Sequence, residues 1–223
     1  MTRRRTILLA LALLAAAAAL AGCGGSSSGG ATTPNASPVL LHPAKLHATA
    51  PNIFQARFTT TKGVFVVTVH RSWAPAGADR FYNLVKAGFY DGDWLFRVVP
   101  GFVVQWGINS APSISKAWEN ATIPDDKVQH SNSRGTITFA AASTPNSRTT
   151  QVFVNLGDNA NLDALGFAPF GEVTSGMGVV SKLYSGYADT PTNDQQQMFT
   201  QGAAFLEKTY PKLDRIVSAR ILK

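Results

Sequence analysis

The chain has 223 residues and a formal net charge of +7, with 20 Lys and Arg against 13 Asp and Glu. Three of the arginines lie at the extreme N-terminus and no run of five like charges occurs, so this charge is too mild and too scattered to indicate a nucleic-acid-binding protein. The single cysteine, Cys23, excludes an intrachain disulfide, a CxxC redox site and a cysteine zinc site.

The N-terminal segment has the pattern of a secretory signal. Arginines at 3–5 precede an apolar run over 7–20, and small residues follow in the sequence LAGC at 20–23. The apolar run is shorter than the ~20 residues that a membrane-spanning helix needs. The segment resembles a bacterial lipoprotein signal, which implies removal of residues 1–22 and acylation of Cys23. An ordinary signal followed by an unmodified thiol is the alternative.

Residues 23–52 are expected to be a lipid-anchored flexible linker. Gly, Ser, Thr and Pro dominate its first half and large apolar side chains are few, so it cannot bury enough surface to offset the entropy of ordering. A flexible tether of this length has an r.m.s. reach of roughly 30 Å, which would hold a domain clear of a bilayer. His42 and His47 have no partner ligands at metal spacing and are expected to be solvated.

Residues 53–223 suit one domain with one hydrophobic core. They open with two β-rich runs on either side of Thr61-Lys62-Gly63, a pattern that predicts a hairpin with a glycine-containing turn. A helix is predicted to begin at Pro75, because apolar residues then recur at helical spacing, and to end at Gly88.

The rest of the domain contains more predicted strands than helices. Strands are predicted over 94–99, 102–106, 135–140, 151–156, 167–173 and 213–222. The polar stretch 108–134 is expected to be a long connection, functional or disordered, and residues 195–210 predict an extra helix. The domain is therefore predicted to be all-β, and periodicity leaves open whether it forms a barrel or a sandwich.

Motifs for nucleophilic, metal or nucleotide chemistry are absent. The sequence has no HExxH, GxSxG, GxxxxGK[ST] or GxGxxG motif, and no two of its four histidines lie three or four residues apart. The carboxylates of Asp125, Asp126 and Asp163 could form an acid–base pair for sugar cleavage, but a turn in solvent is the favoured interpretation. An enzyme with this sequence is expected to use no nucleophile, metal or cofactor.

The stretch FRVVPGFVVQWG, residues 96–107, predicts two short strands that meet at a Pro-Gly corner. It keeps two polar residues, Arg97 and Gln105, in an otherwise apolar run. Together with the later RGTI, QxF and FGxV motifs, which begin at 134, 151 and 170, it closely resembles the cyclophilins, a family of peptidyl-prolyl cis-trans isomerases. The resemblance covers essentially all of residues 53–223.

The resemblance implies a fold and a chemistry. The implied fold is a closed, eight-stranded antiparallel barrel capped by two helices, with 53–60 beside 213–222 and the helix near 195–210 as an addition. Rotation about an X-Pro bond faces a barrier of ~18–20 kcal/mol from amide resonance, and lowering that barrier needs no proton removal or covalent intermediate. It needs a pocket for the proline ring and a donor that favours the twisted amide.

The resemblance also implies roles for particular residues. Arg97 would be catalytic and Gln105 would hold the substrate backbone. The other implied substrate-binding residues are Phe102, Val103, Phe153 and Leu162 in the proline pocket, Gln151 at its edge, Ala140, Ala141 and Ala142 along the peptide, and Asn161 and Phe167 at the rim. From periodicity alone the apolar members could equally be core, and Arg97 could be a surface residue with its head in water.

Five positions depart from the usual family pattern, and they are expected at the rim of the site. There they would alter cyclosporin binding and peptide preference. They are Phe96 and Phe167 in place of histidine, Trp106 in place of glycine, Ala141 in place of asparagine and Asn161 in place of tryptophan. One extra residue lies between Ala142 and Gln151, and another between Asp163 and Phe167.

The expected partners are proline-containing polypeptides and, through lipidated Cys23, a membrane. The protein is expected to be a monomer in the cell envelope that faces the periplasm or the exterior. Two alternatives remain open: a non-catalytic proline-binding module or holdase, and a lipocalin-like barrel that stores a small apolar ligand. The second would need a hollow interior, whereas the many Phe and Val residues favour a filled one.

Overall fold

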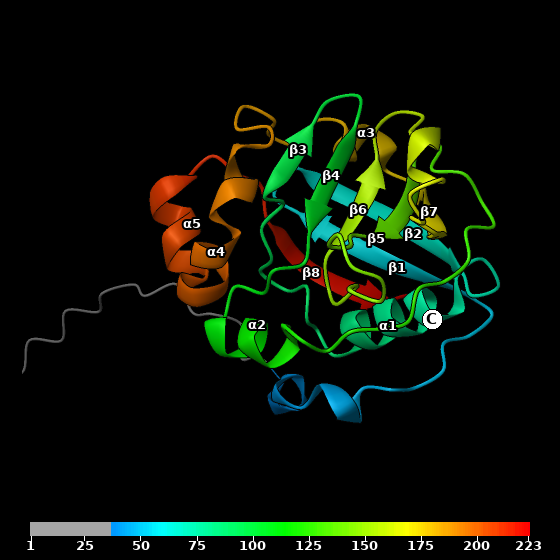
Figure 1. Cartoon of the computed structure of the whole chain (residues 1–223). Coiled ribbons are helices and arrows are strands. Elements are labelled where there is room, and N and C mark those ends of the chain that lie inside the picture. Colours follow the sequence, from blue (N-terminus) through cyan, green and yellow to red (C-terminus); the bar gives the residue numbers. More distant parts are fainter. Residues whose placement is uncertain (1–36) are drawn as a thin grey trace, which may run out of the picture. The chain divides into compact units, whose positions relative to one another are not determined.

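Eight antiparallel strands form one strongly curled sheet in the structure, a computed structural model that describes residues 37–223 (Figure 1). Their order across the sheet is β3-β4-β6-β5-β7-β2-β1-β8. The strands are β1 (Ile53–Thr60), β2 (Gly63–His70), β3 (Arg97–Val99), β4 (Val103–Trp106), β5 (Thr136–Phe139), β6 (Val152–Asn155), β7 (Pro169–Ser175) and β8 (Ile216–Ile221). The eight-stranded antiparallel fold expected from the sequence is confirmed.

The edges of the sheet, β3 and β8, are joined by the residues that precede each strand. Trp94 and Arg215 form an isolated antiparallel bridge, and the Leu95 amide donates to the Asp214 carbonyl at 3.0 Å. The closure is therefore a short contact and not a full ladder. Antiparallel pairing of β1 with β8 confirms that 53–60 and 213–222 lie side by side.

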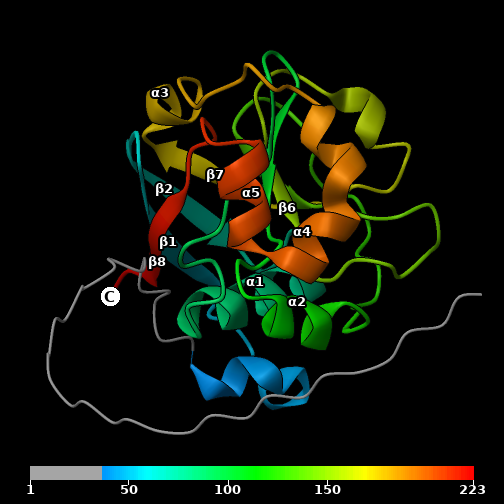
Figure 2. The same cartoon turned by 90° about the vertical axis from the view of Figure 1, so that its left-hand side faces the viewer.

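Helices cover the ends and one flank of the curled sheet (Figures 1 and 2). The predicted first helix is α1 (Pro75–Lys86), which packs on β7 and β8, whereas α3 (Met177–Val180) is a single turn on β2 at the opposite end. The predicted extra helix is two helices, α4 (Gln195–Gln201) and α5 (Ala203–Thr209). They separate at Gly202, where φ is +60°.

A short helix, α2 (Pro112–Trp118), lies inside the stretch predicted to be a long connection. It begins with proline, which suits a first helical turn, and it ends after seven residues. Its buried Ile114 and Trp118 join the main core, and the helix packs against α4 (Figure 2). The flank that carries the extra helices is thus continuous with the barrel.

Residues 37–52 pack on the domain. The prediction that the flexible linker extends to residue 52 is therefore wrong for this part of it. The segment forms two 3-10 turns, η1 (Pro38–Leu41) and η2 (Pro43–Lys45), beneath α1 and α2 (Figure 2). Leu40 is fully buried, and its carbonyl accepts a hydrogen bond from the Trp118 indole at 2.7 Å. A few apolar anchors in a polar segment are enough to dock it. The predicted signal, Cys23 and the remainder of the linker lie outside the described residues.

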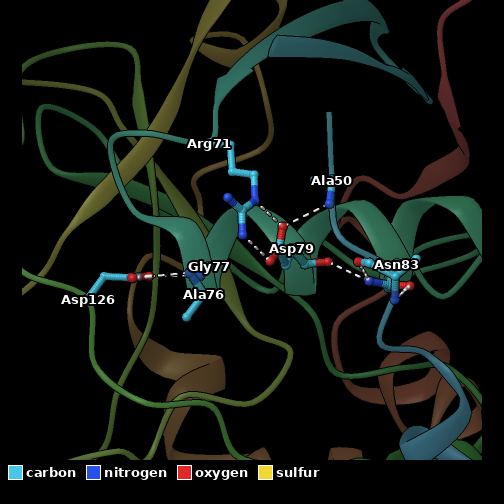
Figure 3. A network of polar contacts seen from close by, with 8 residues as sticks. Ala50, Arg71, Ala76, Gly77, Asp79, Asn83 and Asp126 are labelled. Atoms are coloured by element: carbon cyan, nitrogen blue, oxygen red, sulfur yellow. Dashed lines mark hydrogen bonds and ion pairs between the residues drawn. The ribbon is translucent and has the colours of Figure 1, made fainter. Parts of the chain in front are cut away.

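Two polar side chains of α1 fasten the end of this segment (Figure 3). Asp79 accepts from the Ala50 amide at 2.8 Å and is also paired with Arg71. Asn83 donates to the Ala48 carbonyl at 2.7 Å. Because these bonds satisfy backbone groups that would otherwise face the helix unpaired, they hold the segment in one register.

Aromatic side chains fill the inside of the barrel. The rings of Phe58 and Phe65 stack at 4.9 Å, and the Trp106 ring meets Phe58 edge-on at 5.7 Å. A filled interior does not fit the storage-barrel alternative. Trp106 is fully buried here and Phe96 is buried against the α4–α5 flank, so the expectation that these two positions belong to the rim is wrong.

Asp93, beside the barrel closure, predicts a pH-dependent stability. Its carboxyl is fully buried, and neither oxygen has a hydrogen-bond partner within residues 37–223. Burial, reinforced by the negative charge of Asp91, raises the pKa of Asp93 well above its ordinary value, and the nearby Ser110 amide offsets this only in part. The folded state therefore keeps the proton that the unfolded state releases, and stability falls as pH rises above the ordinary Asp range.

We expect Asp93→Asn, which cannot ionise, to melt at a higher temperature than the wild type at pH 8, with the difference shrinking toward pH 4. Thermal unfolding across this range measures the effect, and Glu172→Gln, at an exposed strand position, is the control. Parallel pH profiles for wild type and Asp93→Asn would contradict the expectation.

Candidate functional site

A tight turn at Pro100-Gly101 sets the register of the two strands that carry the polar pair. The Phe102 amide donates to the Val99 carbonyl at 2.9 Å, and Gly101 has φ +75°, as the third residue of a type II turn requires. This turn places Arg97 of β3 directly opposite Gln105 of β4. Local chain chemistry therefore brings the two polar residues together.

Alternation along the strands separates pocket from core. On β4, Val104 and Trp106 belong to the main core, whereas Val103 lies on the opposite face with Phe153 of β6 and Leu162. These three form a cluster of their own, against which Phe102, Ala140 and Phe167 pack. The apolar residues predicted to bind proline are thus distinct from the residues that fill the barrel.

This second cluster is the floor of an open pocket of about 290 Å³. Phe153 and Phe167 meet edge-on at 5.7 Å. Leu162 ends the 3-10 turn η3 (Ala160–Leu162), and Asn159, just before that turn, donates to the Phe102 carbonyl at 2.9 Å. The lining residues are Arg97, Phe102, Val103, Gln105, Ala140, Ala141, Phe153, Leu162, Phe167, Thr192 and Gln195.

A chain of hydrogen bonds borders the pocket. Arg97 Nη1 donates to Gln105 Oε1 at 3.1 Å, and Gln105 Nε2 donates to Gln151 Oε1 at 2.8 Å. Gln151 in turn donates to Gln195 at 3.0 Å. The Arg97 guanidinium also lies over the Phe102 ring, 5.2 Å from its centroid. A fixed cation therefore stands beside an apolar concavity.

Gly107 allows this border to close. Its φ is +115°, and a Cβ at this position would lie 2.4 Å from the Thr150 carbonyl oxygen. The backbones after β4 and before β6 come together only because no side chain intervenes. That approach places Gln151 within reach of Gln105.

The pocket includes most of the residues predicted for the site, and three of them lie differently. Gln151 reaches it through hydrogen bonds, Ala142 is exposed beyond Ala141, and Asn161 is exposed on η3 and does not line the pocket.

The backbone amides of Ala140, Ala141 and Ala142 differ in their partners. The Ala140 amide donates to the Gln151 carbonyl and the Ala142 amide to Ser147 Oγ. Of these three alanines, only Ala141 has an amide without a partner in residues 37–223.

Sequence reasoning missed three residues on the far side of the pocket. Asp189 accepts from Arg97 Nε at 2.5 Å, and Thr192 and Gln195 contribute to the lining. Asp189 directly precedes the turn η4 (Thr190–Asp194), Thr192 lies in that turn, and Gln195 is the first residue of α4. Of the three, only Gln195 fell within the predicted extra helix, and no motif connects this region with a strand some ninety residues earlier.

The three carboxylates considered for an acid–base pair make hydrogen bonds and an ion pair that hold neighbouring segments of the chain. Asp126 accepts from the Ala76 and Gly77 amides at the N-terminus of α1 (Figure 3). Asp125 pairs with Arg148, and Asp163 accepts from Asn132 and Ser131. The structure therefore gives these carboxylates neither an acid–base role nor the solvated turn that the sequence favoured, because each of them holds neighbouring chain segments in place.

Comparison with known proteins agrees with this geometry. Residues 55–201 match the family model described as cyclophilin type peptidyl-prolyl cis-trans isomerase/CLD. Among curated proteins, the chain is 37% identical to peptidyl-prolyl cis-trans isomerase A of Dickeya dadantii over 56% of this chain and 68% of that protein. It is 34% identical to a peptidyl-prolyl cis-trans isomerase of Acinetobacter baylyi over 66% and 77% of the two chains.

Solved structures show the same fold. A crystal structure of a cyclophilin type isomerase from Cryptosporidium parvum superimposes with a TM-score of 0.57 and 17% identity, covering 77% of this chain and 98% of that one. A second crystal structure of that protein, in the presence of the dipeptide Ala-Pro, gives 0.56 and 18% identity, covering 76% and 99%. By its sequence, its fold and the residues around its pocket, the chain belongs to the cyclophilin-type peptidyl-prolyl cis-trans isomerases.

Proposed function

We propose that this isomerase binds an X-Pro segment of an exported polypeptide in the pocket and accelerates rotation of the X-Pro bond, with Arg97 as the catalytic donor. The observation that carries the proposal is the conjunction of a fixed guanidinium with an apolar concavity. Arg97 is held by two partners, and the concavity is built on Val103, Phe153 and Leu162. Neither the guanidinium nor the apolar concavity by itself would indicate a twisted X-Pro bond as the ligand.

The proposed chemistry follows from amide resonance. In the planar ground state the proline nitrogen shares its lone pair with the carbonyl, and at 90° of twist it regains that pair as an acceptor. A guanidinium placed beside the nitrogen donates to it in the twisted state and gains little in the planar one, so it lowers the barrier. Arginine remains charged across the physiological range, and the step needs no proton transfer.

The apolar floor would hold the proline ring, and the glutamine side chains would bind the substrate backbone. A proline ring in contact with Phe153 and Leu162 is held while the preceding residue turns. Gln105, already oriented by Arg97 and Gln151, is placed to bond the substrate backbone. The crystal structure of the Cryptosporidium relative in the presence of the dipeptide Ala-Pro supports a proline-containing ligand.

The proposed location rests on the sequence of the N-terminal segment. The lipoprotein-like signal that ends at Cys23 supports anchoring of the domain at the outer face of a membrane, with clients among envelope and exported proteins. In residues 37–223, none of the helices has the length and apolar character needed to cross a bilayer. The isomerase would then act on chains that fold after export.

We expect full-length protein expressed in a bacterial host to sediment with membranes, with an intact mass increased by the acyl chains on Cys23. A Cys23→Ser variant should lack this increase in mass, and its kcat/KM on a proline peptide should equal that of the wild type. Cys23 is the only cysteine, so the mass shift has a single site. An unmodified thiol in the wild type would refute the lipid anchor and would leave the proposed isomerase chemistry unaffected.

A further inference from the structure

The segment 187–195 forms an additional wall of the proline pocket. It follows α3 in sequence and ends at the first residue of α4, and it reaches the site at two points: Asp189 accepts from Arg97 Nε at 2.5 Å, and Gln195 accepts from Gln151 Nε2 at 3.0 Å. Both ends of the polar border are therefore held by residues from this one segment. The contacts of this segment with β3 are tertiary, and they do not depend on the strand register that pairs Arg97 with Gln105.

The wall is firmly built. Pro191 is buried, and the Thr192 hydroxyl donates to the Asp189 carbonyl at 2.6 Å. Tyr210, from the end of α5, donates to Asp194 at 2.5 Å, and its ring meets the Tyr187 ring at 5.1 Å. The segment is thus tied to the α4–α5 flank on one side and to the site on the other.

Backbone strain occurs at the residue that precedes Asp189. Ala188 has φ +46°, in the left-handed region that a residue with a Cβ rarely adopts. Its amide donates to the Ser185 carbonyl at 3.0 Å, and the Thr190 amide donates to the Tyr187 carbonyl at 2.9 Å. The hydrogen bonds of the surrounding turn hold Ala188 in this unfavourable conformation. The next residue, Asp189, then directs its carboxylate at the Arg97 guanidinium.

The ion pair itself adds little stability. The Asp189 side chain is 56% exposed and that of Arg97 is 26% exposed, and pairs so accessible to water are weak. Its consequence is geometric. Nε is occupied by Asp189 and Nη1 by Gln105, so Nη2 is the nitrogen of Arg97 without a hydrogen-bond partner in residues 37–223.

We propose that Asp189 is a positioning residue for catalysis, which holds the Arg97 guanidinium so that Nη2 is presented to the twisted amide. This rests on the proposed role of Arg97. A guanidinium held at two nitrogens cannot rotate about its last torsions, whereas one held only by Gln105 samples orientations that do not meet the substrate. The carboxylate also partly neutralises the cation, and that effect alone predicts the opposite result, faster catalysis without Asp189.

Two variants separate positioning from charge. Asp189→Ala removes both the acceptor and the charge, and we expect the isomerisation rate on the enzyme to fall about tenfold, with the peptide dissociation constant within about twofold of the wild type. Asp189→Asn keeps an acceptor oxygen in the same place and should restore most of the lost rate. NMR exchange spectroscopy on a proline peptide gives the rate and the affinity from one sample.

The controls address folding and the parent proposal. Glu207→Ala breaks another exposed ion pair of the same C-terminal region, with Arg215, and should change neither quantity. In an Arg97→Ala background, Asp189→Ala should have no further effect, because it acts through the arginine. If Arg97→Ala itself keeps the wild-type rate, the parent proposal fails.

Three outcomes would overturn the role of Asp189 while leaving that of Arg97 intact. The first is an unchanged or faster rate in Asp189→Ala. The second is an equal loss in the Ala and Asn variants, which would make charge and not orientation decisive. The third is a loss confined to affinity, which would make Asp189 a peptide-binding residue.

Discussion

Replacing Arg97 with alanine is expected to lower kcat/KM for a proline peptide by about 10²- to 10³-fold, the usual cost of losing a transition-state donor. The domain should remain folded, because the side chain is partly exposed and its ion pair with Asp189 contributes little to stability. A protease-coupled assay or NMR exchange gives the rate, and circular dichroism verifies the fold. Equal rates for variant and wild type would refute the assignment.

Two further variants sharpen this test. Arg97→Lys retains the charge but lacks the planar fork that meets Asp189 and Gln105 together, so we expect it to recover little of the rate. Arg57→Ala removes an exposed arginine from β1, remote from the lining of the pocket, and should have no effect. Full recovery by lysine would show that a point charge is sufficient.

Replacing Trp106 with alanine is expected to destabilise the domain by about 3–5 kcal/mol, the range for a large aromatic residue lost from a packed core. The indole is fully buried between the rings of Phe58, Phe65 and Tyr90. Urea unfolding measures the loss. The effect should be on stability, because the side chain faces the barrel interior and not the pocket.

The matched control is Trp73→Ala. That indole is half-buried at the surface between the rings of His70 and His130, so its removal leaves no cavity in the core and should cost much less. Similar losses for the two tryptophans would contradict the placement of Trp106. Trp106→Phe should fall between alanine and wild type, because it keeps an aromatic ring and removes an indole N–H that has no partner within the described residues.

Short-range chemistry made much of the fold and the site predictable. The Pro100-Gly101 turn fixes a two-strand register, so Arg97 and Gln105 face each other whatever surrounds them. The hairpin of β1 and β2 is equally local, and its turn lies where Gly63 predicted it. The separated motifs then indicated the family, because their order and spacing are unlikely to arise by chance.

Period-two alternation could not decide which face of a strand is pocket and which is core. Positions 103 and 104 are both valine and both are buried, yet Val103 lines the site and Val104 fills the barrel. Trp106 was expected at the rim because it departs from the usual family pattern, and not because of its alternation. The side chain of Trp106 points into the core, and this direction is set by the curled sheet, which defines the barrel interior.

By itself, the sequence determined the hairpins and the first helix, because turns and strand pairs depend on neighbours a few positions apart, and its resemblance to the cyclophilins supplied the catalytic candidate and the apolar residues beside it. Tertiary structure alone decided that residues 37–52 dock, that α2 exists, and that Asp189 and Gln195 complete the site. The Arg97–Asp189 contact spans 92 positions of sequence and depends on a buried flank built from Pro191, Met198 and Leu206. No local propensity encodes such a contact, because its free energy comes from packing that exists only after the barrel has closed.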